Sequence, residues 1–151
     1  IRDRIMLIQM LANTGINIVP LLEMLGNTIT VISDTVTQMF QYSDNNNPDN
    51  KLKGIVYAPN LETVELRSID DNSGMTTIIM PKVKTIKSQG FWASYGLKTV
   101  FIPNSCTSLA TNAFSVCGNL TNIYIDNVEG TFGDIAADSS LPNLKVTYLR
   151  K

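Results

Sequence analysis

Leu97-Lys98-Thr99-Val100-Phe101-Ile102 and Leu120-Thr121-Asn122-Ile123-Tyr124-Ile125 carry one pattern of apolar residues, Leu-x-x-Val/Ile-x-Ile. The pattern returns at Leu61–Leu66 and Met75–Met80, and less regularly at Leu144–Leu149. The first positions, 61, 75, 97, 120 and 144, give successive spacings of 14, 22, 23 and 24. Three of these four spacings fall within the roughly 20 to 29 residues typical of solenoid repeats that contain a strand. The sequence therefore predicts a solenoid.

Alternate residues of a strand face opposite sides, so one set of apolar residues from each repeat is expected to face a shared core. This set is Val64, Leu66, Ile78, Met80, Val100, Ile102, Ile123 and Ile125. After each strand the chain is expected to return along a second wall, with Val83 and Ile86 in one repeat and Leu109 and Phe114 in the next. Stacking of the repeats would bury what one repeat cannot.

Three stretches differ in composition. Residues 1–42 have a helical pattern, residues 43–54 form a polar linker, and residues 55–151 hold the repeats. The predicted fold class is α+β: an N-terminal helical or coiled-coil segment followed by a short solenoid with a parallel β-sheet. We interpret the first segment as an oligomerisation or docking element.

A heptad-like spacing in the first segment supports that interpretation. The apolar residues Leu22, Leu25, Ile29, Ile32, Val36 and Met39 are spaced 3, 4, 3, 4 and 3 apart. This is the spacing of a coiled-coil seam, and Ile at both kinds of seam position favours a homotrimer. The seam is short, however, and Gly26 weakens a helix. The alternative is a helix that caps the open end of the solenoid.

The best-preserved repeat also resembles a known family. In Ile102–Ile125 an Ile-Pro step ends the strand, an Asn-Ala-Phe turn follows, and Cys117 precedes the next Asn-Leu pair. This order resembles the BspA-type leucine-rich repeat, and Met80-Pro81 with Gln89-Gly90-Phe91 matches it again. Ile125-Asp126 departs from the pattern because it lacks the Pro, and residues 128–140 keep only Phe132 and Ile135 as core candidates.

The resemblance implies a role in contacts between proteins. Domains of this family occur in bacterial surface proteins that bind host or extracellular-matrix proteins, and in appendage proteins of bacteriophages. The family pattern contains no catalytic residues. We therefore expect a non-enzymatic protein of a virion or of the extracellular or cell-surface space.

Composition agrees with this expectation. The chain has no His, which removes the commonest general base and the commonest metal ligand. A net charge of -1 gives no basic footprint for nucleic acid, and the apolar runs are too short for membrane insertion. Cys106 and Cys117 are expected to be reduced core residues, with a disulfide as the alternative. No catalytic residue, cofactor or metal site is predicted.

Carboxylates are the remaining candidates for chemistry. Asp70 and Asp71 precede a turn, and Asp134 and Asp138 would share a face if their segment were helical. Acid–base catalysis needs a desolvated pair with separated pKa values, whereas these residues lie in polar loops. An enzyme is therefore not expected.

The outward residues of the strands form a second pattern. Alternation turns outward Ile79, Phe101, Tyr124 and Tyr148, with Thr99 and Asn122 beside them. This stripe is interpreted as a contact for a glycan or protein, as a face packed against another subunit, or as ordinary strand composition. A slip of one residue in the last repeat would turn Tyr148 inward.

These observations favour a phage virion appendage, fibre-like and homo-oligomeric, that presents a repeat module for assembly or for contact with a host surface. The expected partners are other virion or cell-surface proteins, and a host-surface protein or glycan. The alternative is a fragment of a bacterial adhesin that binds an extracellular protein or glycan.

Overall fold

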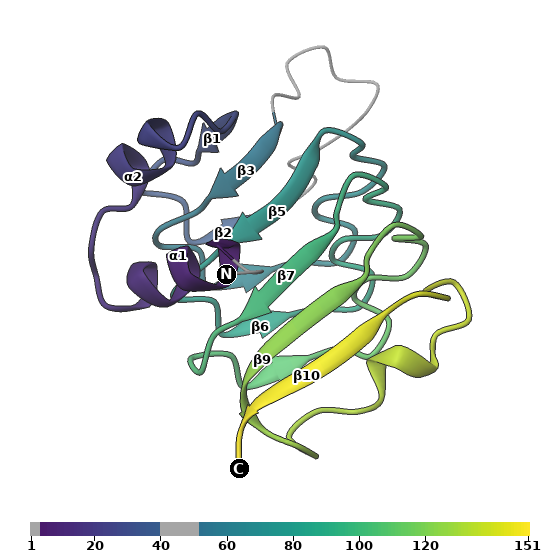
Figure 1. Cartoon of the computed structure of the whole chain (residues 1–151). Coiled ribbons are helices and arrows are strands. Elements are labelled where there is room, and N and C mark those ends of the chain that lie inside the picture. Colours follow the sequence, from purple (N-terminus) through teal and green to yellow (C-terminus); the bar gives the residue numbers. More distant parts are fainter. Residues whose placement is uncertain (1–3, 40–51) are drawn as a thin grey trace.

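The computed structural model describes residues 4–39 and 52–151. Two helices, α1 (Arg4–Asn13) and α2 (Val19–Met24), precede the strands (Figure 1). The strands are β1 (Ile29–Val31), β2 (Gln38–Met39), β3 (Gly54–Tyr57), β4 (Thr63–Val64), β5 (Met75–Ile79), β6 (Thr85–Ile86), β7 (Thr99–Ile102), β8 (Ser108–Leu109), β9 (Asn122–Val128) and β10 (Lys145–Arg150). A short 3-10 helix, η1 (Ile135–Ala137), lies before β10. Neither described helix has the length and apolar character needed to span a bilayer.

The strands form two walls, and every strand pair is parallel. The front wall contains β1, β3 and β5, followed by β7, β9 and β10, and the Lys98 amide bonds the Thr76 carbonyl at 3.0 Å where β5 meets β7. The back wall contains β2, β4, β6 and β8 in that order. The chain thus forms a parallel solenoid of about five turns, which confirms the predicted solenoid with a parallel β-sheet.

Apolar residues that recur in the same place of each coil fill the space between the walls. Val56 lies opposite Ile78, and Val100 lies opposite Ile123, and all four are fully buried. Met80, Ile102 and Ile125 continue the same core, as the alternation predicts. The β-branched side chains suit this position because they pack well on a pleated surface.

A second column lies at the turn after the back wall. Phe91 and Phe114 are fully buried, and their rings stack with centroids 5.1 Å apart and planes 3° apart. Backbone bonds tie the two coils together at the same point, since the Phe91 amide donates to the Ala113 carbonyl at 2.9 Å. The predicted inward position of Phe114 is confirmed.

The first predicted repeat is misplaced. Leu61–Leu66 runs through β4 on the back wall, not along the front wall, and Leu66 is 58% exposed although it was expected in the core. The front-wall position belongs to Leu52, which is buried before β3 and precedes Met75 by one repeat length. Leu61 and Val64 are buried on the return strand, so both walls carry the same short apolar motif and pattern alone cannot separate them.

The coiled-coil prediction is wrong. Helix α2 ends at Met24, and Gly26 has a φ of 73°. The Gly26 amide donates to the Glu23 carbonyl, and the Asn27 amide donates to the Leu22 carbonyl. This is a Schellman motif, which stops a helix. The seam residues are accordingly distributed over α2 (Leu22), its C-cap (Leu25), β1 (Ile29), the β1–β2 connection (Ile32, Val36) and β2 (Met39).

Residues 29–39 are the first coil of the solenoid. β1 pairs with β3 and β2 pairs with β4, while Ile32 and Met39 belong to the main core. Within the described part of the predicted helical segment 1–42, the helices end at Met24, and the solenoid begins well before residue 55. Residues 43–51 of the predicted linker lie outside the described residues, and Gly54 already belongs to β3.

Ile32→Asp should lower the free energy of unfolding by about 3 kcal/mol or more, because the carboxylate would lie unpaired in the solenoid core. Val31→Asp is the matched control, since the neighbouring side chain is half exposed and should tolerate the charge. Chemical denaturation followed by circular dichroism would measure both. Equal and small losses would contradict the placement of residues 29–39 in the solenoid.

Phe114→Ala should cost about 3 to 5 kcal/mol, because it removes a stacked and fully buried ring. Phe91→Ala should behave alike, whereas the exposed Thr107→Ala should change little. Denaturant midpoints provide the measurement. A loss below about 1 kcal/mol at both Phe positions would show that this column does not hold the coils together.

Candidate interaction surface

The predicted stripe does form a column on the outer side of the front wall. Phe101 lies opposite Tyr124, Thr99 lies opposite Asn122, and Ile79 lies opposite Tyr57 of the preceding coil. Tyr148 does not belong to it. The residue opposite Tyr124 is Thr147, and Tyr148 lies opposite Ile125 and packs against the core. Leu120 precedes the inward Ile123 by three positions, whereas Leu144 precedes its register partner Val146 by only two, and that slip reverses the alternation.

The column is covered, contrary to the prediction that it is exposed. Ile79 is 1% exposed, Phe101 2% and Tyr124 9%. Ile8 and Ala12 of α1, Leu22 of α2, and Ile18 between them pack with Ile55, Tyr57 and Ile79 in a second apolar cluster. Figure 1 shows the two helices along the β1, β3 and β5 side of this wall.

The helices therefore cover the outer face of the front wall over β1, β3 and β5 and do not cap the open end of the solenoid, which corrects the alternative prediction. A partner could reach Ile79 only after the helices move. Thr99 and Asn122 are half-buried, the Thr77 hydroxyl donates to the Thr99 carbonyl, and the Asn122 amide group donates to the Thr121 hydroxyl at 3.2 Å. Binding of a ligand by the stripe stays a prediction.

The back wall presents a different surface. Its outward column is Gln38, Thr63, Thr85 and Ser108, which lie in register and are half-buried or exposed. Ion pairs run along both sides of it: Lys84 Nζ lies 2.6 Å from Glu62 Oε1, and Lys87 Nζ lies 2.6 Å from Glu65 Oε1. Gln38 Nε2 donates to the other oxygen of Glu65 at 3.1 Å.

These contacts join three successive coils across an exposed surface. The Lys84–Glu62 pair is solvent-exposed, and such pairs stabilise a fold only slightly. The Glu65 side chain is only 13% exposed between Gln38 and Lys87, so this carboxylate is partly shielded from solvent. This surface was not among those predicted from the sequence. A signal was present, because Glu62 and Lys84, like Glu65 and Lys87, are separated in the sequence by the length of one coil.

Two of the candidate carboxylates, Asp70 and Asp138, make local polar contacts. Asp70 accepts from Arg67 Nε at 3.1 Å, and Asp138 accepts from the Ser115 hydroxyl at 2.5 Å and from the Ser140 amide and hydroxyl at 2.9 and 2.6 Å. Partial burial raises the pKa of Asp138, but these hydrogen bonds outweigh it, and the pKa lies below its usual value. No group of three potential metal ligands occurs among residues 4–39 and 52–151.

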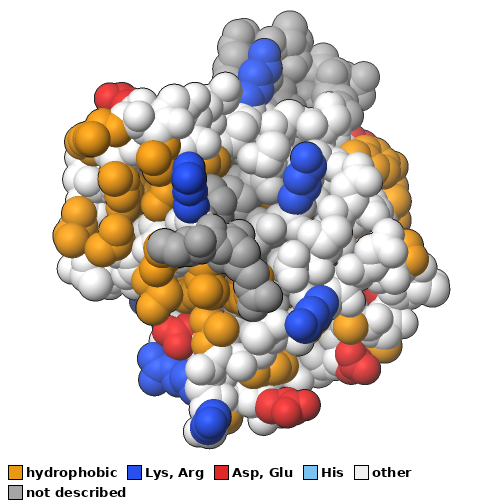
Figure 2. All heavy atoms as spheres, in the orientation of Figure 1, with side chains coloured by type: hydrophobic (Ala, Val, Ile, Leu, Met, Phe, Trp, Pro, Cys, Tyr) orange, Lys and Arg blue, Asp and Glu red, His pale blue; other side chains and the backbone are white. Residues whose placement is uncertain are grey.

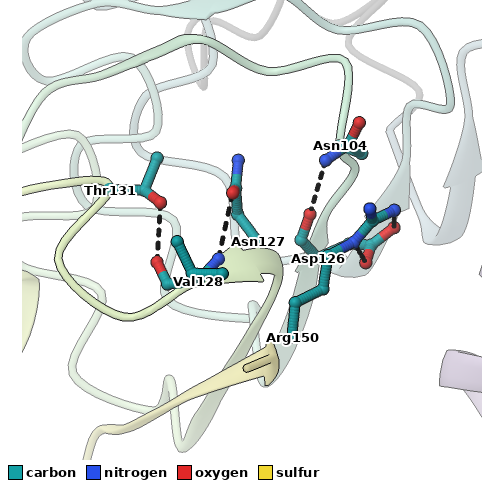
Figure 3. Close-up of polar contacts among 6 residues, drawn as sticks. All are labelled: Asn104, Asp126, Asn127, Val128, Thr131 and Arg150. Carbon is teal, nitrogen blue, oxygen red and sulfur yellow. Dashed lines mark hydrogen bonds and ion pairs between the residues drawn. The ribbon is translucent and has the colours of Figure 1, made fainter.

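The departure from the Ile-Pro pattern has a structural counterpart. Asp126 stands where other coils have Pro, and its carboxylate oxygens accept from Arg150 Nε and Nη2 at 2.8 and 3.3 Å (Figure 3). Its carbonyl accepts from Asn104 Nδ2 at 3.1 Å. Asp126 therefore links three coils through polar contacts.

The C-terminal end of the solenoid is hollowed. A hollow of about 400 Å³ is lined by Phe132, Ile135, Val146 and Tyr148 together with polar residues of the 129–136 segment. These four side chains also pack against the main core. The hollow is therefore the end of that core.

Both cysteines are free and buried, which confirms the expectation of reduced core residues. Burial raises the pKa of Cys106 to about 11, although a bond to the Ser108 backbone lowers it slightly. Burial also raises the pKa of Cys117 to about 12. A hydrogen bond to the Ser94 backbone lowers this pKa, and the charge of Asp138 raises it further. Neither thiol is a nucleophile near neutral pH.

The folded protein should therefore leave both thiols unmodified by a disulfide reagent such as dithionitrobenzoate at pH 8. Only about one Cys106 side chain in a thousand would be a thiolate there, and fewer of Cys117. After unfolding in guanidinium, two thiols per chain should react rapidly. Fast reaction of either thiol in the folded protein would contradict this burial.

Comparison with known proteins agrees with the coil geometry. Residues 42–147 match the BspA type leucine rich repeat region, in six copies. A search of curated proteins and a search of solved structures found no match. The family match spans most of the chain and covers the coils from β3 into β10. The chain therefore belongs to the BspA type leucine-rich-repeat family.

Proposed function

We propose that this chain is a non-enzymatic module that binds another protein through its back wall. Leucine-rich-repeat domains generally mediate contacts between proteins. The observation that carries the proposal is the difference between the two walls: α1 and α2 cover the front wall near its start, whereas the back wall keeps Gln38 and Ser108 exposed. A rigid core holds this surface, and rigid elements lose little entropy on binding.

The chemistry of the back wall suits a polar contact. Hydroxyl groups of Thr63, Thr85 and Ser108 lie in one column, and one coil supplies two Glu side chains where the next supplies two Lys side chains. Charges of both signs on one surface select a partner with the reverse arrangement.

For the biological setting we propose a phage virion appendage that presents this surface to the host cell or to a neighbouring virion protein. A second candidate is an adhesin of the bacterial surface, which is favoured by the occurrence of BspA-type repeats in bacterial surface proteins. Both settings use the same wall. They differ in the partner, which is a bacterial surface or a virion protein in the first and an extracellular protein in the second.

Binding of fluorescently labelled protein to intact bacteria and to immobilised extracellular-matrix proteins would test this proposal. Thr63→Arg with Thr85→Arg should weaken binding by about tenfold or more, because two bulky cations would interrupt the outward column. Asn112→Arg with Asn143→Arg is the matched control, since both positions are exposed and lie off the wall. Circular dichroism would establish that both variants fold.

Binding to bacteria alone supports the appendage, and binding to matrix proteins alone supports the adhesin. Equal binding by wild type and the back-wall variant would contradict the assignment of the site. Absence of binding to either class would contradict the adhesin and the contact of an appendage with the host cell.

A further inference from the structure

Helix α1 is apolar on two sides. Ile8 and Ala12 face the front wall and are buried. Leu7, Met10 and Leu11 are exposed, and residues three and four apart lie on the same side of a helix. A helix that is apolar all round is normally buried on every side, so the outer side of α1 lacks the cover that its composition predicts.

The exposed apolar surface continues beyond α1. It comprises Leu7, Met10, Leu11, Ile16, Met24 and Leu25, each 40–83% exposed, and we call this set the helix patch. Figure 2 shows hydrophobic side chains gathered over both helices on this face. Among the described residues, seven of the eleven exposed large apolar side chains lie between Leu7 and Val31. Such a concentration marks a contact surface, whereas scattered apolar residues do not.

The charge of this region limits the possible partner. Between residues 5 and 33 the only charged side chain is Glu23. A basic or acidic peptide would find almost nothing to pair with here. Helices that lie in a membrane interface carry Lys and Arg on their polar side, and α1 has only Arg4 at its start. The surface therefore suits a neutral and apolar protein surface.

We propose that the helix patch is the surface through which copies of this chain associate. A second copy supplies a neutral, apolar surface of matching composition, because an interface with two-fold symmetry uses the same patch on both subunits. The six side chains expose on the order of 500 Å², so two patches would bury about 1,000 Å², near the lower limit for a specific interface. Polar residues around the patch would add to this area.

This inference goes beyond the proposed function and does not depend on it, because the helix patch lies on the front-wall side and the proposed binding surface is the back wall. It also differs from the predicted coiled-coil seam. Of the seam residues only Leu25 belongs to the patch, while Leu22, Ile32 and Met39 are buried within one chain.

Sedimentation velocity and light scattering on the whole chain, from about 1 to 100 µM, would test the inference. Wild type should associate into a dimer. Met10→Glu with Met24→Glu should raise the dissociation constant about 100-fold or more, because two carboxylates would be desolvated in the contact. Leu66→Glu with Val128→Glu is the matched control, since both residues are exposed but lie outside the patch.

Association of wild type and control, with a folded monomeric patch variant, supports the inference. A monomer at about 100 µM for wild type would overturn it, as would association of the patch variant equal to that of wild type. Monomeric wild type that sediments with vesicles of phosphatidylcholine and phosphatidylglycerol would assign the patch to a membrane surface and would also overturn the inference. Binding of the back-wall partner is measured separately, so either proposal can fail alone.

Discussion

Each coil of this chain places apolar side chains on its inner face that only the neighbouring coil can cover. Val100 lies beside Ile123 on the neighbouring strand of the front wall, and Phe91 stacks on Phe114 at the turn. Both columns therefore need coils of nearly equal length. The nearly constant spacing from Leu52 through Met75, Leu97 and Leu120 to Leu144 meets this requirement. Stability in such a stack is a sum of contacts between neighbours, so the regular spacing sets the register of both walls at once.

The sequence predicts the middle of the stack well and its beginning poorly. Residues 75–125 repeat with enough regularity that the inward positions follow from alternation alone. Residues 29–39 fit a helical seam equally well, since Ile32, Val36 and Met39 are spaced 4 and 3 apart. The segment from Ile32 to Met39 also aligns with the segment from Ile102 to Leu109 of a later coil. The Thr37 carbonyl accepts from the Glu62 amide, just as the Glu62 carbonyl accepts from the Lys84 amide of the next coil. A heptad-like spacing in a short segment therefore cannot decide between a helix and a coil.

The interaction surfaces were harder to predict, because alternation gives the side on which a residue lies and not what covers it. Phe101 and Tyr124 lie outward, as predicted, yet they are buried, and the helices cover Ile79 beside them. The alternation of apolar residues also does not predict the backbone conformation of the turns. Ala93 and Val116 both have positive φ, at 57° and 64°, and occupy equivalent turns one coil apart. For a β-branched side chain this conformation is strained, so its use at Val116 reflects the demand of the stack and not local preference.

The two ends of the solenoid differ in structure. At the start, α1 and α2 cover apolar residues on the outside of the front wall, and because α1 is apolar on two sides the cover itself presents a new apolar surface. At the end, Asp126 occupies the position that Pro occupies in earlier coils. Its carbonyl accepts from Asn104 of the preceding coil, and its carboxylate accepts from Arg150 of the last strand. The shorter approach to β10 turns Tyr148 inward, and this brings its ring against the core beside Val146. Thr147 takes the outward position next to Tyr124, so the apolar outer column of the front wall ends at Tyr124 on β9. The large exposed apolar surface lies over the helices instead.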